Sequence, residues 1–158
     1  MMTSYDLPRV LILLTPGFDY EVVEASLERM RCEDVEIFYV GLSKEPICGE
    51  GGIEIAPDLS LSDVLKFERC DLMLIPDSLY NNSHLMTEPR IHRLIQQVME
   101  HDGLVATMPD AAAALNRVGL PTPSDRGQFK VRDRHAFLQC IDQAVQLFCN
   151  PYSVVNAT

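Results

Sequence analysis

The sequence lacks long apolar runs and has few positive charges. Its longest uninterrupted apolar runs, residues 10–14 and 111–115, are far shorter than the roughly 20 residues that a membrane-spanning helix needs. The 13 Lys and Arg residues are outnumbered by 23 Asp and Glu residues, which gives a formal net charge of −10. A phosphate backbone repels such a surface. We therefore expect neither a nucleic acid nor a membrane as a partner.

Disulfide and metal-binding patterns are also missing. The five cysteines, at 32, 48, 70, 140 and 149, form no Cys-x-x-Cys pair, and the four histidines show no zinc-ligand spacing. Residues 1–6 contain no basic segment of the kind that opens a signal peptide. We therefore expect a cytoplasmic protein with free thiols, no metal and no cofactor.

The composition of the chain is typical of a globular protein. Its 158 residues are 47% hydrophobic, which suits one domain over residues 1–158 with a core of ordinary size. Short apolar segments alternate with amphipathic ones. The pattern predicts strands at 10–14, 35–40, 72–75 and 104–107, short strands at 53–55 and 129–131, and helices at 21–31, 60–63, 88–101, 110–118 and 134–148.

Two of these helices carry specific signals. Within 88–101, apolar residues recur at helical spacing and form one stripe, made of Ile91, Leu94, Ile95, Val98 and Met99. The short helix at 60–63 begins with a serine that is followed three residues later by an aspartate, which is the spacing of a capping box. Both features predict where these helices begin and which face they bury.

The alternation of strands and helices predicts an α/β fold. Apolar strands separated by helices favour a three-layer αβα sandwich with a mainly parallel, flavodoxin- or Rossmann-like sheet. Ligands of such sheets bind beyond the carboxyl ends of the strands. The residues that follow Leu14, Ile75 and Thr107 are therefore the first candidates for a functional site.

Five segments, in order and spacing, resemble the ThiJ/PfpI family of the class I glutamine amidotransferase-like superfamily. They are residues 10–18, 40–42, 55–58, 71–76 and 103–107. The resemblance covers about residues 10–120, and it leaves a shortened C-terminal region at 121–150 and a tail at 151–158. It implies the same αβα fold, hydrolase, amidase or deglycase chemistry, and assembly as a homodimer or a larger homo-oligomer.

The resemblance also implies a catalytic cysteine after the fourth strand. Counted from Gly103, that position holds Pro109. Proline has no nucleophilic atom, and its ring fixes φ near −65°, whereas a nucleophile elbow needs a strained backbone. Thr107, Pro109 and Asp110 instead resemble an ordinary capped helix start.

Two further functional positions of the family differ here. The carboxylate that partners the cysteine aligns with Val22, with Glu21 one residue earlier and Asp19 three residues earlier. Asp77 and Ser78 stand where the family has two glycines, whose N–H groups serve as oxyanion donors. An acidic side chain there would oppose a developing oxyanion. Three departures at one site predict a non-catalytic protein, acting as a binding or regulatory module.

Two alternatives stay open. One is an enzyme with a relocated site that uses Cys48 or Ser78 as nucleophile. The other is an acidic crevice for an amine or a divalent cation, because carboxylate oxygens suit both; otherwise Asp77 and Asp110 only cap helices. The candidate crevice residues are Asp19, Glu21, Asp77, Ser78, Pro109 and Asp110, and Cys48, beside Gly49 in a turn, is the expected accessible thiol. The expected partners are a second copy of the chain and a small-molecule ligand.

Overall fold

A parallel sheet forms the centre of the protein. The computed structural model describes residues 7–31, 34–76, 87–107 and 134–149. Within them, five strands pair side by side in the order β5-β2-β1-β6-β7, and every pair is parallel. Their bounds are β1 Arg9–Leu13, β2 Glu36–Gly41, β5 Leu59–Ser60, β6 Leu72–Ile75 and β7 Leu104–Thr107. The predicted mainly parallel sheet is confirmed.

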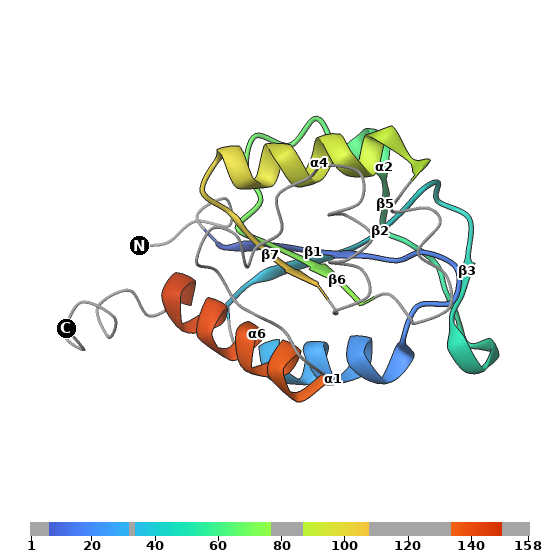
Figure 1. The fold of residues 1–158 in the computed structure, drawn as a ribbon, viewed down its shortest axis with the longest axis horizontal. Coiled ribbons are helices and arrows are strands. Elements are labelled where there is room, and N and C mark those ends of the chain that lie inside the picture. The colour runs from blue at the N-terminus through green and yellow to red at the C-terminus, as the bar shows by residue number, and fades with distance from the viewer. Residues whose placement is uncertain (1–6, 32–33, 77–86, 108–133, 150–158) are drawn as a thin grey trace.

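Helices cover both faces of this sheet (Figure 1). Helices α1 (Tyr20–Met30) and α6 (Arg134–Cys149) lie on one face, and α2 (Leu61–Val64) and α4 (Pro89–Glu100) lie on the other. Successive side chains of a strand point to opposite faces. Accordingly Leu11 and Met73 belong to the core cluster under α4, whereas Ile12 and Leu74 belong to the cluster under α1 and α6. The predicted αβα sandwich is therefore confirmed.

The two specific helix signals are also confirmed. All five residues of the apolar stripe on α4 are buried. At the start of α2, the Asp63 N–H donates to Ser60 Oγ (3.3 Å) and the Ser60 N–H donates to Asp63 Oδ2 (3.0 Å). These hydrogen bonds hold the pKa of Asp63 below its ordinary value, and the bond from the Ser60 backbone has the largest effect. The capping box fixes the point at which the chain leaves β5.

A small hairpin stands beside the main sheet. Strands β3 (Ile47–Cys48) and β4 (Glu54–Ile55) pair antiparallel, and a 3₁₀ turn, η2 (Glu50–Gly52), joins them. The strand expected at 53–55 is thus the second arm of a hairpin. The helix expected at 110–118 and the strand expected at 129–131 lie outside the described residues. No helix in the described ranges has the length and apolar character that crossing a membrane requires.

The central strands are expected to show the slowest amide hydrogen exchange of the described chain. Leu11, Ile12, Met73 and Val105 are each at most 1% exposed, and core strands of this kind open only by global unfolding. Native-state hydrogen exchange with mass spectrometry measures this. Rapid exchange within β1 would contradict the central position of that strand.

Candidate functional site

The loop after β1 is hydrogen-bonded to the residue that follows β6, at the point where the strand order of the sheet reverses. The chain runs from β1 to β2 on one side and later returns to β6 on the other side of β1, so the reversal lies between β1 and β6. There the Asp19 N–H donates to the Pro76 carbonyl (2.9 Å). Asp19 is 6% exposed and caps α1, because its Oδ1 accepts from the Val22 N–H (3.3 Å). This is where parallel α/β sheets bind ligands.

The hairpin is attached to this loop by backbone hydrogen bonds. The Gly17 N–H donates to the Cys48 carbonyl and the Glu50 N–H donates to the Phe18 carbonyl, each at 2.9 Å. Between these two bonds, Gly49 packs directly on the Phe18 ring, since a Cβ at Gly49 would lie 2.6 Å from two ring atoms. Only a glycine allows this approach. The hairpin turn is therefore held against the start of α1.

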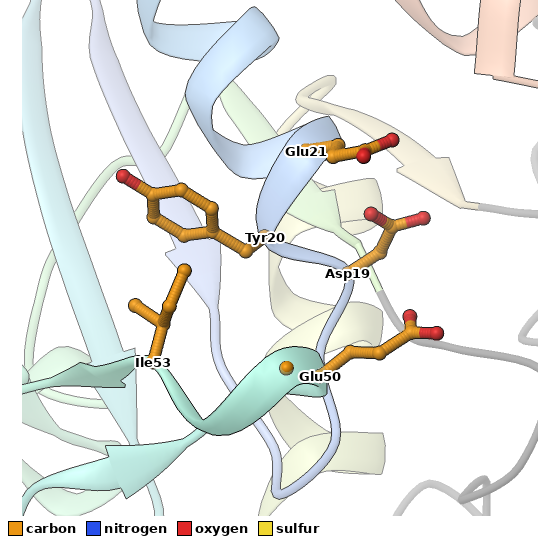
Figure 2. A pocket seen from close by; sticks show the side chains of 6 residues that line it. Asp19, Tyr20, Glu21, Glu50 and Ile53 are labelled. Carbon is orange, nitrogen blue, oxygen red and sulfur yellow. The ribbon is translucent and has the colours of Figure 1, made fainter.

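A cleft of about 310 Å³ lies between the start of α1 and the hairpin turn. It is lined by Asp19, Tyr20 and Glu21 from the helix and by Glu50, Gly51 and Ile53 from the hairpin. Figure 2 shows that the three carboxylates point to the same side, whereas the Tyr20 ring and the Ile53 side chain lie opposite each other. The cleft thus has an acidic half and an apolar half.

The structure brings together two of the predicted crevice residues. Asp19 and Glu21 both line the cleft. Val22, which aligns with the family's carboxylate, is 1% exposed and lies in the core cluster under α1 and α6. Four other predicted residues, Asp77, Ser78, Pro109 and Asp110, lie outside the described residues.

Four residues that line this cleft were not identified as site residues from the sequence: Tyr20, Glu50, Gly51 and Ile53. In the sequence, Tyr20 lies between the two predicted acidic residues. Glu50 and Ile53 come from a segment about 30 positions further along the chain. The turn itself was visible, because Gly51 and Gly52 lie between Glu50 and Ile53. No local pattern indicates that this turn lies against the first helix.

The two described thiols have opposite surroundings. Cys48 is exposed, as expected, and Cys70 is buried. The Cys70 Sγ–H donates to the Leu72 carbonyl (3.3 Å), and burial raises the pKa of this thiol to about 12. A thiol held in its neutral form is a poor nucleophile. Among the described residues, no group of three His, Cys, Asp or Glu side chains is placed to hold a metal ion.

Comparisons with known proteins give a consistent result. Residues 8–123 match the model of the DJ-1/PfpI family. A protein from Danio rerio named Parkinson disease protein 7 homolog is 26% identical over 113 residues, which are 71% of this chain and only 60% of that relative. The crystal structure of Drosophila melanogaster DJ-1beta superposes with a TM-score of 0.75 at 17% identity, covering 95% of each chain.

A second solved structure has the same fold. A cysteine-to-alanine mutant of a DJ-1 superfamily protein from Salmonella typhimurium superposes with a TM-score of 0.73 at 14% identity. The superposition covers 93% of this chain and 98% of the other. At such low identities these structures establish the fold and leave the activity open.

Proposed function

The chain belongs to the DJ-1/PfpI family, and from that premise we propose that it is a non-catalytic member that acts as a binding or regulatory module. In the family pattern that the sequence resembles, hydrolysis uses a cysteine, a partner carboxylate and two glycines. The aligned residues here are Pro109, Val22 and the pair Asp77 and Ser78. Proline cannot replace a thiol nucleophile.

The burial of Val22 is the observation that carries this proposal. Its side chain lies among apolar neighbours of the core and is 1% exposed. Glu21 is turned by about 100° around the helix axis relative to Val22, and it lines the cleft. A carboxylate at position 22 would be buried without water, which is costly unless it is paired. The local fold therefore favours valine over the family's acid.

Replacing Pro109 by cysteine alone is expected to leave hydrolysis of small esters and amides at background. The variant supplies a thiol, but the partner carboxylate and the two oxyanion glycines are still absent, and one lost oxyanion donor alone lowers the rate by about 10² to 10³. Steady-state assays of Pro109→Cys beside the unmodified protein measure this. Robust turnover by the single variant would show that the elbow geometry is intact.

For the ligand, the cleft favours a small amine. Three carboxylates lie on one side of it, and the formal net charge of −10 attracts cations to the whole surface. The opposite side, with Tyr20 and Ile53, suits a carbon skeleton. An amine with a carbon skeleton can contact both halves of the cleft, whereas a divalent cation would use only the carboxylates.

Thermal unfolding with and without spermidine tests the amine proposal. A ligand that binds only the folded state raises the melting temperature. We expect a concentration-dependent rise that is reduced in Glu21→Gln and retained in Glu24→Gln, which removes the same charge from an exposed residue of α1 that does not line the cleft. Equal shifts in both variants would indicate nonspecific attraction to an acidic surface and would contradict binding in the cleft.

The proposal includes a homodimer, which family membership supports. Sedimentation velocity at micromolar concentrations distinguishes the 17.8 kDa monomer from a species of twice that mass. A protein that stays monomeric across this concentration range would contradict the dimer.

We also place the protein in the cytoplasm. Cys48 is an exposed thiol without a disulfide, and exposed thiols persist most readily in reducing compartments. Cell fractionation followed by alkylation of free thiols tests this. Recovery from an oxidising compartment would contradict it.

A further inference from the structure

A single aspartate continues the edge of the central sheet where its last strand stops. Strand β5 ends the sheet next to β2, and it pairs only with Val40 and Gly41. The preceding residue of β2, Tyr39, is bonded to Asp58 instead. The Tyr39 N–H donates to Asp58 Oδ2 (2.8 Å), and the Tyr39 carbonyl accepts from the Asp58 N–H (2.9 Å). Asp58 therefore makes the pair of hydrogen bonds that a residue of a neighbouring strand would make.

The outer side of β2 continues beyond Tyr39 towards the start of the strand. No strand of the described ranges lies beside it there. The Glu36 N–H donates towards β1, to the Pro8 carbonyl, so the backbone groups of Ile37 face the outer side, as those of Tyr39 do. The side chains of Ile37 and Phe38 are half-buried on opposite faces of the sheet. An edge strand with apolar side chains is a template for pairing with another chain.

The sequence of this strand favours pairing with a copy of itself. Of residues 35–40, five of the six are β-branched or aromatic, and none is proline or glycine. Segments of this composition pair readily with identical segments when their backbone edge is open. The partner that fits an open edge of β2 is therefore the β2 strand of a second copy.

We propose that Asp58 is an edge cap that prevents β2 from pairing with the β2 strand of a second copy. With the carboxylate in place, the Tyr39 N–H has its acceptor, and of residues 36–39 only Ile37 offers an N–H to the outer side. Without the carboxylate, Ile37 and Tyr39 would offer two N–H groups about 6.6 Å apart along the strand. That spacing is the repeat of a strand ladder, so the edge would accept a further strand.

Sedimentation velocity of two Asp58 variants tests the edge cap. Asp58→Ala removes the acceptor, whereas Asp58→Asn removes the same charge and keeps an oxygen that can accept from the Tyr39 N–H. At equal protein concentration, we expect Asp58→Ala to form a species of about twice the mass of the unmodified protein, because a symmetric contact closes after two copies. We expect Asp58→Asn to keep the mass of the unmodified protein.

Ser60→Ala is the control for general destabilisation. It removes the hydroxyl that accepts from the Asp63 N–H and leaves the two bonds between Asp58 and Tyr39 in place. An unchanged mass in Asp58→Ala would overturn the edge cap. An increase in Ser60→Ala equal to that in Asp58→Ala would attribute association to lost stability, and an equal increase in Asp58→Asn would attribute it to charge. Either result would also overturn the proposal.

Amide hydrogen exchange measured by NMR locates the contact. In the associated Asp58→Ala species we expect the Ile37 and Tyr39 amides to be protected, and exchange of both at the rates of an open edge would overturn the pairing of β2 with β2. If Asp58→Ala does not fold, the unmodified protein decides. There we expect the Tyr39 amide, which is hydrogen-bonded to Asp58, to exchange about tenfold more slowly than the Ile37 amide after correction for intrinsic rates. Equal rates would overturn the edge cap.

Discussion

Replacement of Phe18 by alanine is expected to lower the free energy of unfolding by about 3–5 kcal/mol. Phe18 has 0% exposure and is among the largest fully buried side chains in the described chain. Its ring fills the space beside Gly49, and its carbonyl accepts from the Glu50 N–H. The substitution leaves a cavity between the β1–α1 loop and the hairpin. The loss therefore affects the core and the base of the candidate cleft together.

Urea unfolding measures this loss of stability. Two further variants are compared with Phe18→Ala. Phe38→Ala truncates the same residue type on the opposite face of the sheet, where the ring is only partly buried, and we expect a smaller effect. Gly49→Ala would place a methyl group too close to the Phe18 ring. We expect this variant to lower the free energy of unfolding as well. A loss below about 1 kcal/mol in Phe18→Ala would contradict the central position of this ring.

Alkylation of the thiols is expected to differ by at least about 100-fold between Cys48 and Cys70. The thiolate is the species that reacts, and the rise of the Cys70 pKa from 9.0 to about 12 lowers its ionised fraction about 1000-fold. The higher intrinsic reactivity of a more basic thiolate offsets part of this factor. Burial adds to the difference, because it keeps the reagent from the sulfur. Cys48 is exposed and should be the first cysteine labelled.

Peptide mass spectrometry during limited treatment with iodoacetamide measures both rates. At neutral pH we expect slow labelling overall, and no stoichiometric sulfinic acid after mild peroxide. Cys48→Ser serves as the control that identifies the fast site. Rapid labelling of any cysteine at pH 6 would reveal an activated thiol and would support the enzyme with a relocated site.

The raised pKa of Cys70 also gives stability a pH dependence. Between about pH 9 and 12 the unfolded chain loses the thiol proton while the folded chain keeps it. The unfolded state then binds fewer protons, so the free energy of unfolding falls as pH rises through this window. Relative to Cys70→Ala, we expect the unmodified protein to lose about 2 kcal/mol between pH 8 and pH 10.5. A constant difference between the two proteins would contradict the burial of a neutral thiol.

Most of the sheet could be predicted because its strands carry a local signal. Strands β1, β6 and β7 contain short apolar runs, β2 is rich in β-branched and aromatic residues, and the apolar stripe of α4 extends along a helix of 12 residues. The strands β3 and β5 were not predicted, since two residues such as Ile47 and Cys48 are too few to show a period. They are strands only because their partners lie alongside, which is a tertiary effect.

Only the part of the candidate site that follows β1 could be predicted from the sequence. Asp19 and Glu21 follow directly after a buried strand, and the rule that ligands bind beyond strand ends identifies them. Glu50 and Ile53 belong to the site through contacts that no pattern near them encodes: the packing of Phe18 on Gly49 and the two backbone hydrogen bonds of the hairpin. The apolar half of the cleft could therefore be identified only from the folded structure and not from the sequence.

Steady-state turnover at high protein concentration tests the proposed absence of catalysis most directly. Small esters, amides and reactive aldehydes are offered to the unmodified protein, to Cys48→Ser and to Ser78→Ala, with heat-unfolded protein as the blank. The non-catalytic proposal predicts rates equal to the blank for all three proteins and every substrate. Saturable turnover above the blank that disappears in Cys48→Ser or in Ser78→Ala would contradict it and would identify the nucleophile.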